Sequence, residues 1–157
     1  SQDIRVLVVG GDDGRGQAVS RLKQRAKDLD IDGMVEFVGR VDQDQLPIYY
    51  NAADVCVVPS FYESFGLAAL ESMACGTPVV AYRVGGLPTI IKHGSTGYLK
   101  SWRCPEAFAN SLEMMTSSNS LIKAMGQASR ERAETMGWDR VAFTLSEHYK
   151  SLGREIV

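Results

Sequence analysis

The chain has 157 residues, of which 45% are hydrophobic and 23% charged, and its formal net charge is −2. This composition is typical of one globular domain, which at this length buries roughly 70% of the surface of its unfolded chain without disulfides or metals. A slightly acidic chain has no basic field for nucleic acid or for an anionic membrane surface, so we expect neither as a partner.

The three cysteines, Cys56, Cys75 and Cys104, are odd in number and far apart. They form neither a metal-binding pair nor a disulfide framework, so we expect a reducing, cytoplasmic location and no metal site. No signal-peptide pattern opens the sequence, and no apolar run approaches the roughly 20 residues of a membrane helix. Membrane association is therefore not expected.

Strand and helix signals alternate through the first part of the chain. Apolar, β-branched runs that end at Gly10 and Gly39 predict short buried strands, and apolar residues at helical spacing predict helices. The expected elements are a strand over 4–9, a helix with Val19, Leu22, Ala26 and Leu29 on one face, a strand over 34–38, a helix from a capping box of Asp42 and Gln45 to Ala53, and a strand over 54–59.

The second part begins with an apolar helix and ends with three more helices. We expect a helix over 66–75 that stops at Gly76, strands over 78–82 and 97–99, and helices over 105–115, 118–136 and 139–152. Short apolar strands separated by helices predict an α/β fold, a Rossmann-like doubly wound parallel sheet. Because no linker or repeat interrupts the pattern, we expect one domain over 1–157.

Ligands of such sheets bind at the carboxyl ends of the strands, which directs attention to the segment 59–71. This segment is a loop that enters the N-terminus of an apolar helix, where the amides of Phe65, Gly66 and Leu67 would be free to bind a phosphate. Gly66 has no side chain and would let the ligand approach closely.

Two glutamates flank this helix start. An unpaired carboxylate at Glu71, among apolar residues, would be costly, so Glu71 needs a partner such as the hydroxyl pair of a sugar. Glu63 lies in the loop, on the ligand side of the helix start. The alternative is that Glu71 faces solvent with Ser72 and that Glu63 is an ordinary surface residue.

An ordered set of motifs resembles the C-terminal, donor-binding domain of the retaining GT-B glycosyltransferases of family 4, which include sucrose-phosphate synthase-like and mycothiol-type enzymes. The set is Ala53-Asp54-Val55, Pro59-Ser60, Glu63 and Glu71 with seven residues between them, Phe65-Gly66-Leu67, Ala74-Cys75-Gly76-Thr77-Pro78-Val79-Val80, Gly85-Gly86, Thr96-Gly97-Tyr98-Leu99 and Gly137-Trp138-Asp139-Arg140. The resemblance covers nearly the whole chain and implies a nucleoside-diphosphate sugar as donor substrate, with no other cofactor.

The resemblance also implies a role for individual residues. Glu63 would be the catalytic residue and hold hydroxyls of the donor sugar, while Glu71 would hold the ribose hydroxyls of the nucleotide. The remaining donor-binding residues would be Ser64, Phe65, Gly66 and Leu67 at the diphosphate and sugar, and Arg40 and Val41 at the base. Transfer of a hexosyl group would retain the anomeric configuration.

In the family, the acceptor-binding N-terminal domain and an Arg/Lys pair of the first strand-helix unit lie upstream of the matched region. We therefore expect the chain alone to be inactive, with that N-terminal domain as its partner in the parent protein. Thr89 departs from the glutamate that many members carry after the Gly-Gly turn. The alternatives are a sugar-nucleotide epimerase of GT-B fold and a non-catalytic nucleotide-binding or interaction module; the spacing of Glu63 and Glu71 favours transfer over epimerisation.

Several other residues are expected to have structural rather than functional roles. We expect His93 to be a turn residue, His148 to be structural and Trp138 to belong to the core. The glycines of 10–16 lack the spacing of a dinucleotide fingerprint and predict a tight turn.

Overall fold

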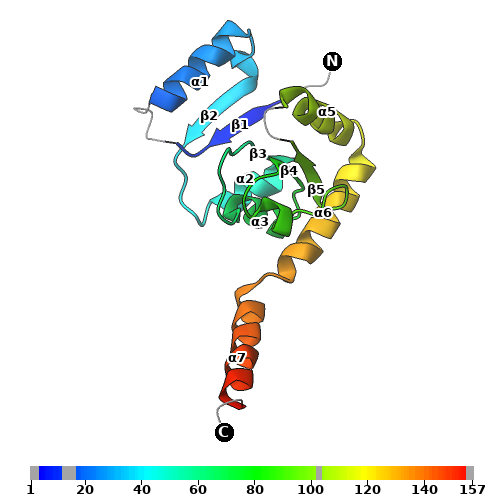
Figure 1. Cartoon of the computed structure of the whole chain (residues 1–157). Coiled ribbons are helices and arrows are strands. Elements are labelled where there is room, and N and C mark those ends of the chain that lie inside the picture. The colour runs from blue at the N-terminus through cyan, green and yellow to red at the C-terminus, as the bar shows by residue number, and fades with distance from the viewer. Residues whose placement is uncertain (1–3, 12–16, 102–103, 155–157) are drawn as a thin grey trace. The chain divides into compact units, whose positions relative to one another are not determined.

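The computed structural model describes residues 4–11, 17–101 and 104–154 (Figure 1). The contacts divide the chain into two compact units, Ser1–Leu46 and Pro47–Val157, and we describe each by itself. None of the described helices combines the length and the apolar character of a membrane-spanning segment.

The first unit contains a pair of parallel strands. Its elements are β1 (Val6–Val9), α1 (Gln17–Asp28), the 3-10 turn η1 (Asp32–Met34) and β2 (Val35–Gly39). Val6 lies opposite Val35, and the amide of Gly10 donates to the carbonyl of Gly39 across 2.7 Å. Met34, which we expected in the strand, belongs to η1 because its amide donates to the carbonyl of Ile31.

The predicted apolar face of α1 is only partly buried. Ala26 is buried, whereas Leu22 and Leu29 are about half exposed. The predicted glycine turn over 10–16 lies mostly outside the described residues.

The second unit contains a three-stranded parallel sheet with the order β3-β4-β5. Val57 pairs with Val80, which in turn pairs with Tyr98. The elements are α2 (Leu46–Ala52, whose first residue is the last of the first unit), β3 (Cys56–Val58), α3 (Leu67–Ala74), β4 (Val79–Tyr82), α4 (Leu87–Ile90), β5 (Gly97–Lys100), α5 (Pro105–Thr116), α6 (Asn119–Glu134) and α7 (Trp138–Arg154).

Helices cover both faces of this sheet, as the central strand β4 shows. All four of its residues are buried, and successive side chains of a strand point to opposite faces. Val79 and Ala81 pack in one cluster with residues of α3, α4 and the end of α6. Val80 and Tyr82 pack in a second cluster with residues of α5 and the middle of α6. The predicted α/β fold, with parallel strands covered on both faces, is confirmed.

Two arginines of α6 hold the ends of two other helices. The guanidinium of Arg130 donates to the carbonyl of Ala74, the last residue of α3. The guanidinium of Arg132 donates to the carbonyls of Thr89 across 2.6 Å and Ile90 across 3.3 Å, at the end of α4. These bonds satisfy carbonyl groups that have no partner inside their own helices.

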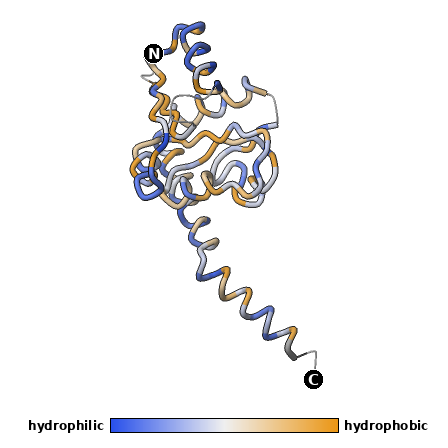
Figure 2. The backbone as a smooth tube through the Cα atoms, turned by 90° about the vertical axis from the view of Figure 1, so that its left-hand side faces the viewer, coloured by the Kyte–Doolittle hydropathy of each residue, from blue (hydrophilic) through white to orange (hydrophobic). Residues whose placement is uncertain are grey.

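Two local predictions were wrong, and one helical turn was not predicted. Helix α2 begins at Leu46 rather than at a capping Asp42, because the amide of Gln45 bonds the backbone carbonyl of Asp42 in a turn. The segment after β4, for which the sequence analysis predicted no helix, contains the single turn α4. Trp138 is 85% exposed, so it is not a core residue; it opens α7, along which hydrophobic and hydrophilic residues alternate (Figure 2).

Candidate functional site

The loop between β3 and α3 carries Glu63, and this glutamate organises the loop around itself. Its side-chain oxygen Oε1 accepts a hydrogen bond from the amide of Gly66 across 3.1 Å, and its backbone carbonyl accepts one from the amide of Gly86 across 3.2 Å. Gly66 has φ +102°, a conformation that favours glycine. The half-buried Glu63 is therefore held in place at the entrance to α3, and it is not a freely moving surface residue.

This bond alters the expected phosphate site. Three free amides were expected, but that of Gly66 is already bonded to Glu63. The amides of Phe65 and Leu67 make no hydrogen bond to any residue that the structure describes. The helix start thus presents two open amides. Gly66 itself is buried, and a Cβ added there would come within 2.8 Å of Leu87 Cδ2.

Glu71, in the second turn of α3, has the partner that its position required. The hydroxyl of Tyr50, from α2, donates to Glu71 Oε2 across 3.2 Å. The alternative was that Glu71 and Ser72 both face solvent. Ser72 does not, because it is buried and its hydroxyl donates to the carbonyl of Thr77. Leu67, the first residue of α3, is 60% exposed.

Tyr50 is held by hydrogen bonds at its backbone carbonyl and at its side-chain hydroxyl, and the sequence analysis did not identify it as a site residue. Its carbonyl accepts a 2.6 Å hydrogen bond from the hydroxyl of Thr77, while its own hydroxyl reaches Glu71. Burial and then the negative charge of Glu71 raise the pKa of Tyr50 well above the usual value of 10.0, which keeps the phenol protonated as a donor. Nothing in the sequence singles out Tyr50, because its partner lies 21 positions away.

The remaining predicted donor-binding residues fall into two groups. Ser64, Phe65, Gly66 and Leu67 lie on one continuous loop and helix start between Glu63 and Glu71. Arg40 and Val41 follow β2 in the first unit, where Arg40 is exposed and Val41 is half-buried.

The cysteines and His93 lie outside the loop that carries Glu63. Burial raises the pKa of the Cys56 and Cys75 thiols, so both favour the neutral form. His93 Nδ1 accepts a hydrogen bond from the amide of Leu99 across 3.0 Å, and its ring packs edge-on against Tyr98. His93, which we expected to be a turn residue, forms an isolated β-bridge with Gly97 and lies within the turn that the hydrogen bond from the Ser95 amide to the Lys92 carbonyl closes. Among the described residues, no group of three or more His, Cys, Asp or Glu side chains is placed to hold a metal ion.

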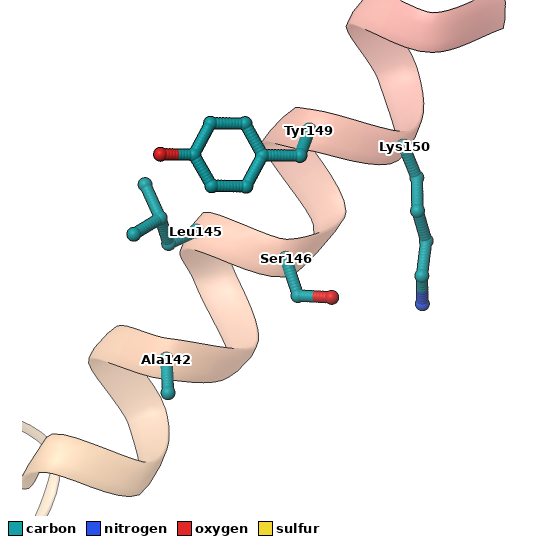
Figure 3. A pocket seen from close by; sticks show the side chains of 5 residues that line it. All are labelled: Ala142, Leu145, Ser146, Tyr149 and Lys150. Carbon is teal, nitrogen blue, oxygen red and sulfur yellow. The ribbon is translucent and has the colours of Figure 1, made fainter.

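Two hollows lie elsewhere on the second unit. One is formed by α7 alone, between side chains of successive turns that include Leu145, Tyr149 and Lys150 (Figure 3). The other is an apolar groove that α7 lines together with Phe65, Ile90 and Met136, and His148 lies on its wall. Of the predicted donor-binding residues, only Phe65 lines either hollow, so neither contains the pair of glutamates.

The sequence of the chain has known relatives. Residues 1–132 match the family model of the glycosyl transferases group 1. A D-inositol 3-phosphate glycosyltransferase of Streptomyces bingchenggensis is 40% identical over 147 residues, which are 93% of this chain and 32% of that protein. The chain thus spans about a third of the length of the curated relatives it matches.

Solved structures agree with this assignment. Sucrose-phosphate synthase from Thermosynechococcus elongatus is 36% identical with a TM-score of 0.86, over 96% of this chain and 39% of that one. The Anabaena protein HepE (Alr3699) in complex with UDP-glucose is 26% identical with a TM-score of 0.80, over 94% and 41%. The C-terminal domain of a glycosyl transferase group 1 family protein (LpcC) from Francisella tularensis is 31% identical with a TM-score of 0.75, over 83% and 68%. The chain therefore belongs to the group 1 glycosyl transferases, and its fold is that of their C-terminal, GT-B half.

Proposed function

We propose that this chain is the donor-binding domain of a retaining glycosyltransferase and that it binds a UDP-hexose. The observation that carries the proposal is the placement of two held glutamates, Glu63 and Glu71, at the two ends of one loop and helix start. The complex of HepE with UDP-glucose supports uridine as the base.

Each glutamate has one oxygen held by the protein and one left for the ligand. Glu71 Oε2 accepts from Tyr50, so Oε1 is the oxygen that would accept the ribose hydroxyls. Glu63 Oε1 accepts from Gly66, so Oε2 would accept hydroxyls of the donor sugar. A carboxylate that is already fixed loses little conformational freedom when the ligand arrives.

The diphosphate would lie between the two carboxylates. The amides of Phe65 and Leu67 are its donors, and the N-terminal end of the α3 dipole adds a partial positive charge. Arg40 and Val41 remain predicted contacts of the base, and the whole of 1–157 is proposed to act as one donor-binding domain.

In the parent enzyme, the bond between the anomeric carbon and the β-phosphate oxygen would break, and UDP would leave with the bonding electrons. The acceptor oxygen would bond to the same face of the anomeric carbon, and its hydroxyl proton would pass to the departing β-phosphate oxygen of UDP. By itself the 157-residue chain is expected to show no transfer, because the acceptor side of the site would be supplied by the rest of the parent chain.

Titration of the chain with UDP, UDP-glucose and ADP, followed by protein NMR, tests the proposal. We expect UDP and UDP-glucose to shift the amide signals of Phe65 and Leu67, and ADP to bind more weakly. The absence of any shift with millimolar UDP would overturn the proposal. With the full parent protein, conversion of UDP-glucose into an epimer without an acceptor would favour the epimerase instead.

A further inference from the structure

The turn between β4 and α4 lies directly against the loop that carries Glu63. The amide of Gly86 donates to the carbonyl of Glu63 across 3.2 Å. A Cβ added to Gly85 would overlap that same carbonyl oxygen. A Cβ added to Gly86 would lie 2.6 Å from the carbonyl oxygen of Phe65 and 2.7 Å from that of Ser64.

The two glycines are required for different reasons. Gly85 has φ +50°, so backbone conformation alone favours glycine there. Gly86 has φ −76° and ψ −13°, which any residue adopts. Only the closeness of the loop backbone therefore requires glycine at position 86.

The helix that follows the Gly85–Gly86 turn is held in place by packing and by hydrogen bonds. Gly86 precedes α4, and the side chains of Leu87 and Ile90 on α4 are fully buried beneath Gly66. The far end of α4 is held by the two hydrogen bonds of Arg132. The loop thus rests on a support that packing and hydrogen bonds hold at both ends.

We propose that the Gly85–Gly86 turn positions the donor-binding loop, which makes these glycines positioning residues for the sugar and diphosphate end of the site. This inference rests on the proposed function. The turn touches the loop from Glu63 to Phe65, whereas Glu71 is held separately by Tyr50. A change at Gly86 therefore weakens ligands that reach the loop and spares those that reach only Glu71.

The test compares three ligands on the wild-type chain and on Gly86→Ala. UMP reaches only the nucleoside end, while UDP and UDP-glucose extend to the loop. We expect Gly86→Ala to weaken UDP and UDP-glucose by about tenfold and to change the affinity for UMP less than twofold. Affinities are measured by NMR titration.

Two glycines provide matched controls. Gly33 has no positive φ, and a Cβ there would meet nothing within 4 Å, so Gly33→Ala measures the effect of an added methyl group alone. Gly94 has φ +80° and equally open surroundings, so Gly94→Ala measures the effect of backbone strain without any contact with the loop. Neither control is expected to change the ratio of UDP to UMP affinity.

A second variant covers the case in which Gly86→Ala does not fold. Arg132→Met releases the end of α4 without any clash and is expected to lower the ratio of UDP to UMP affinity by about threefold. An unchanged ratio in every folded variant, or an equal loss for all three ligands, would overturn the positioning role. A wild-type chain that binds none of the ligands would instead overturn the proposed function, and this role with it.

Discussion

The hydroxyl of Tyr50 donates to the carboxylate of Glu71 across 3.2 Å and so joins the end of α2 to the second turn of α3. The bond is partly buried and charge-assisted, and it directs one carboxylate oxygen toward Tyr50. In the proposed site this leaves the other oxygen in a fixed direction for the ribose.

Tyr50→Phe removes this donor and keeps the ring. Because a buried hydrogen bond contributes about 0.5–1.5 kcal/mol net, we expect the free energy of unfolding to fall by about that amount and the affinity for UMP and UDP to fall several-fold. Urea denaturation and calorimetry measure the two effects. Tyr49→Phe is the matched control, since the Tyr49 hydroxyl makes no hydrogen bond to the described residues. A loss of the same size in both variants would mean that the Tyr50 hydroxyl contributes nothing specific.

The raised pKa of Tyr50 gives stability a dependence on alkaline pH. A phenol whose pKa is higher in the folded state holds its proton there after the unfolded chain has lost it, so its contribution is complete below the unfolded value of about 10 and declines as the pH rises above it. We expect the stability of the wild type to fall more steeply than that of Tyr50→Phe between pH 9.5 and 11, a window of roughly one unit around that value. Urea midpoints across this range measure the difference. If the urea midpoints of the two proteins fall equally with pH, the pKa of Tyr50 is not raised in the folded state.

Glu71→Gln tests the ribose contact. The amide keeps the shape of the side chain and loses its charge, and hydrogen bonds to charged groups are worth about 1.5–3 kcal/mol. We expect the fold to survive and the affinity for UDP and UDP-glucose to fall together by at least about tenfold. Glu106→Gln, on the exposed side of α5, is the control. Calorimetry that gives equal UDP affinities for wild type and Glu71→Gln would return Glu71 to a structural role.

Glu63→Gln separates the sugar end from the nucleotide end. The amide oxygen still accepts from the Gly66 amide, which Glu63→Ala would leave without that partner, so the loop keeps its conformation. We expect UDP-glucose to bind several-fold more weakly and UDP to bind almost as before. NMR titration with both ligands decides the matter. If the affinities for UDP-glucose and UDP fall equally, Glu63 does not act at the sugar end alone and the assignment of the two ends is wrong.

The sequence alone predicts the sheet and most helices because their signals are local. The run Val79–Tyr82 is apolar on both faces, which is typical of a buried parallel strand, and Ser118 caps α6 by accepting from the amide of Leu121. The single turn α4 was missed because four residues are too few to show helical periodicity.

The site could be predicted only in part, for a related reason. Glu63, Glu71 and the helix start between them lie in one continuous segment, so spacing alone brings them together. Tyr50 and Gly86 reach that segment from other parts of the chain, and their contacts depend on how the helices pack. The sequence also suggested that the Gly66 amide binds a phosphate, but in the structure this amide donates to Glu63 instead.

Arg130 and Arg132 lie two positions apart on α6, so they leave the helix in different directions and reach different partners. One holds the end of the helix that carries Glu71, and the other holds the helix on which the Glu63 loop rests. Helix α6, which carries none of the proposed ligand contacts, is thus hydrogen-bonded to both of the helices on which the proposed nucleoside and sugar ends of the site depend. Substitutions in α6 are therefore expected to alter the affinity for the donor without replacing any residue that is proposed to contact it.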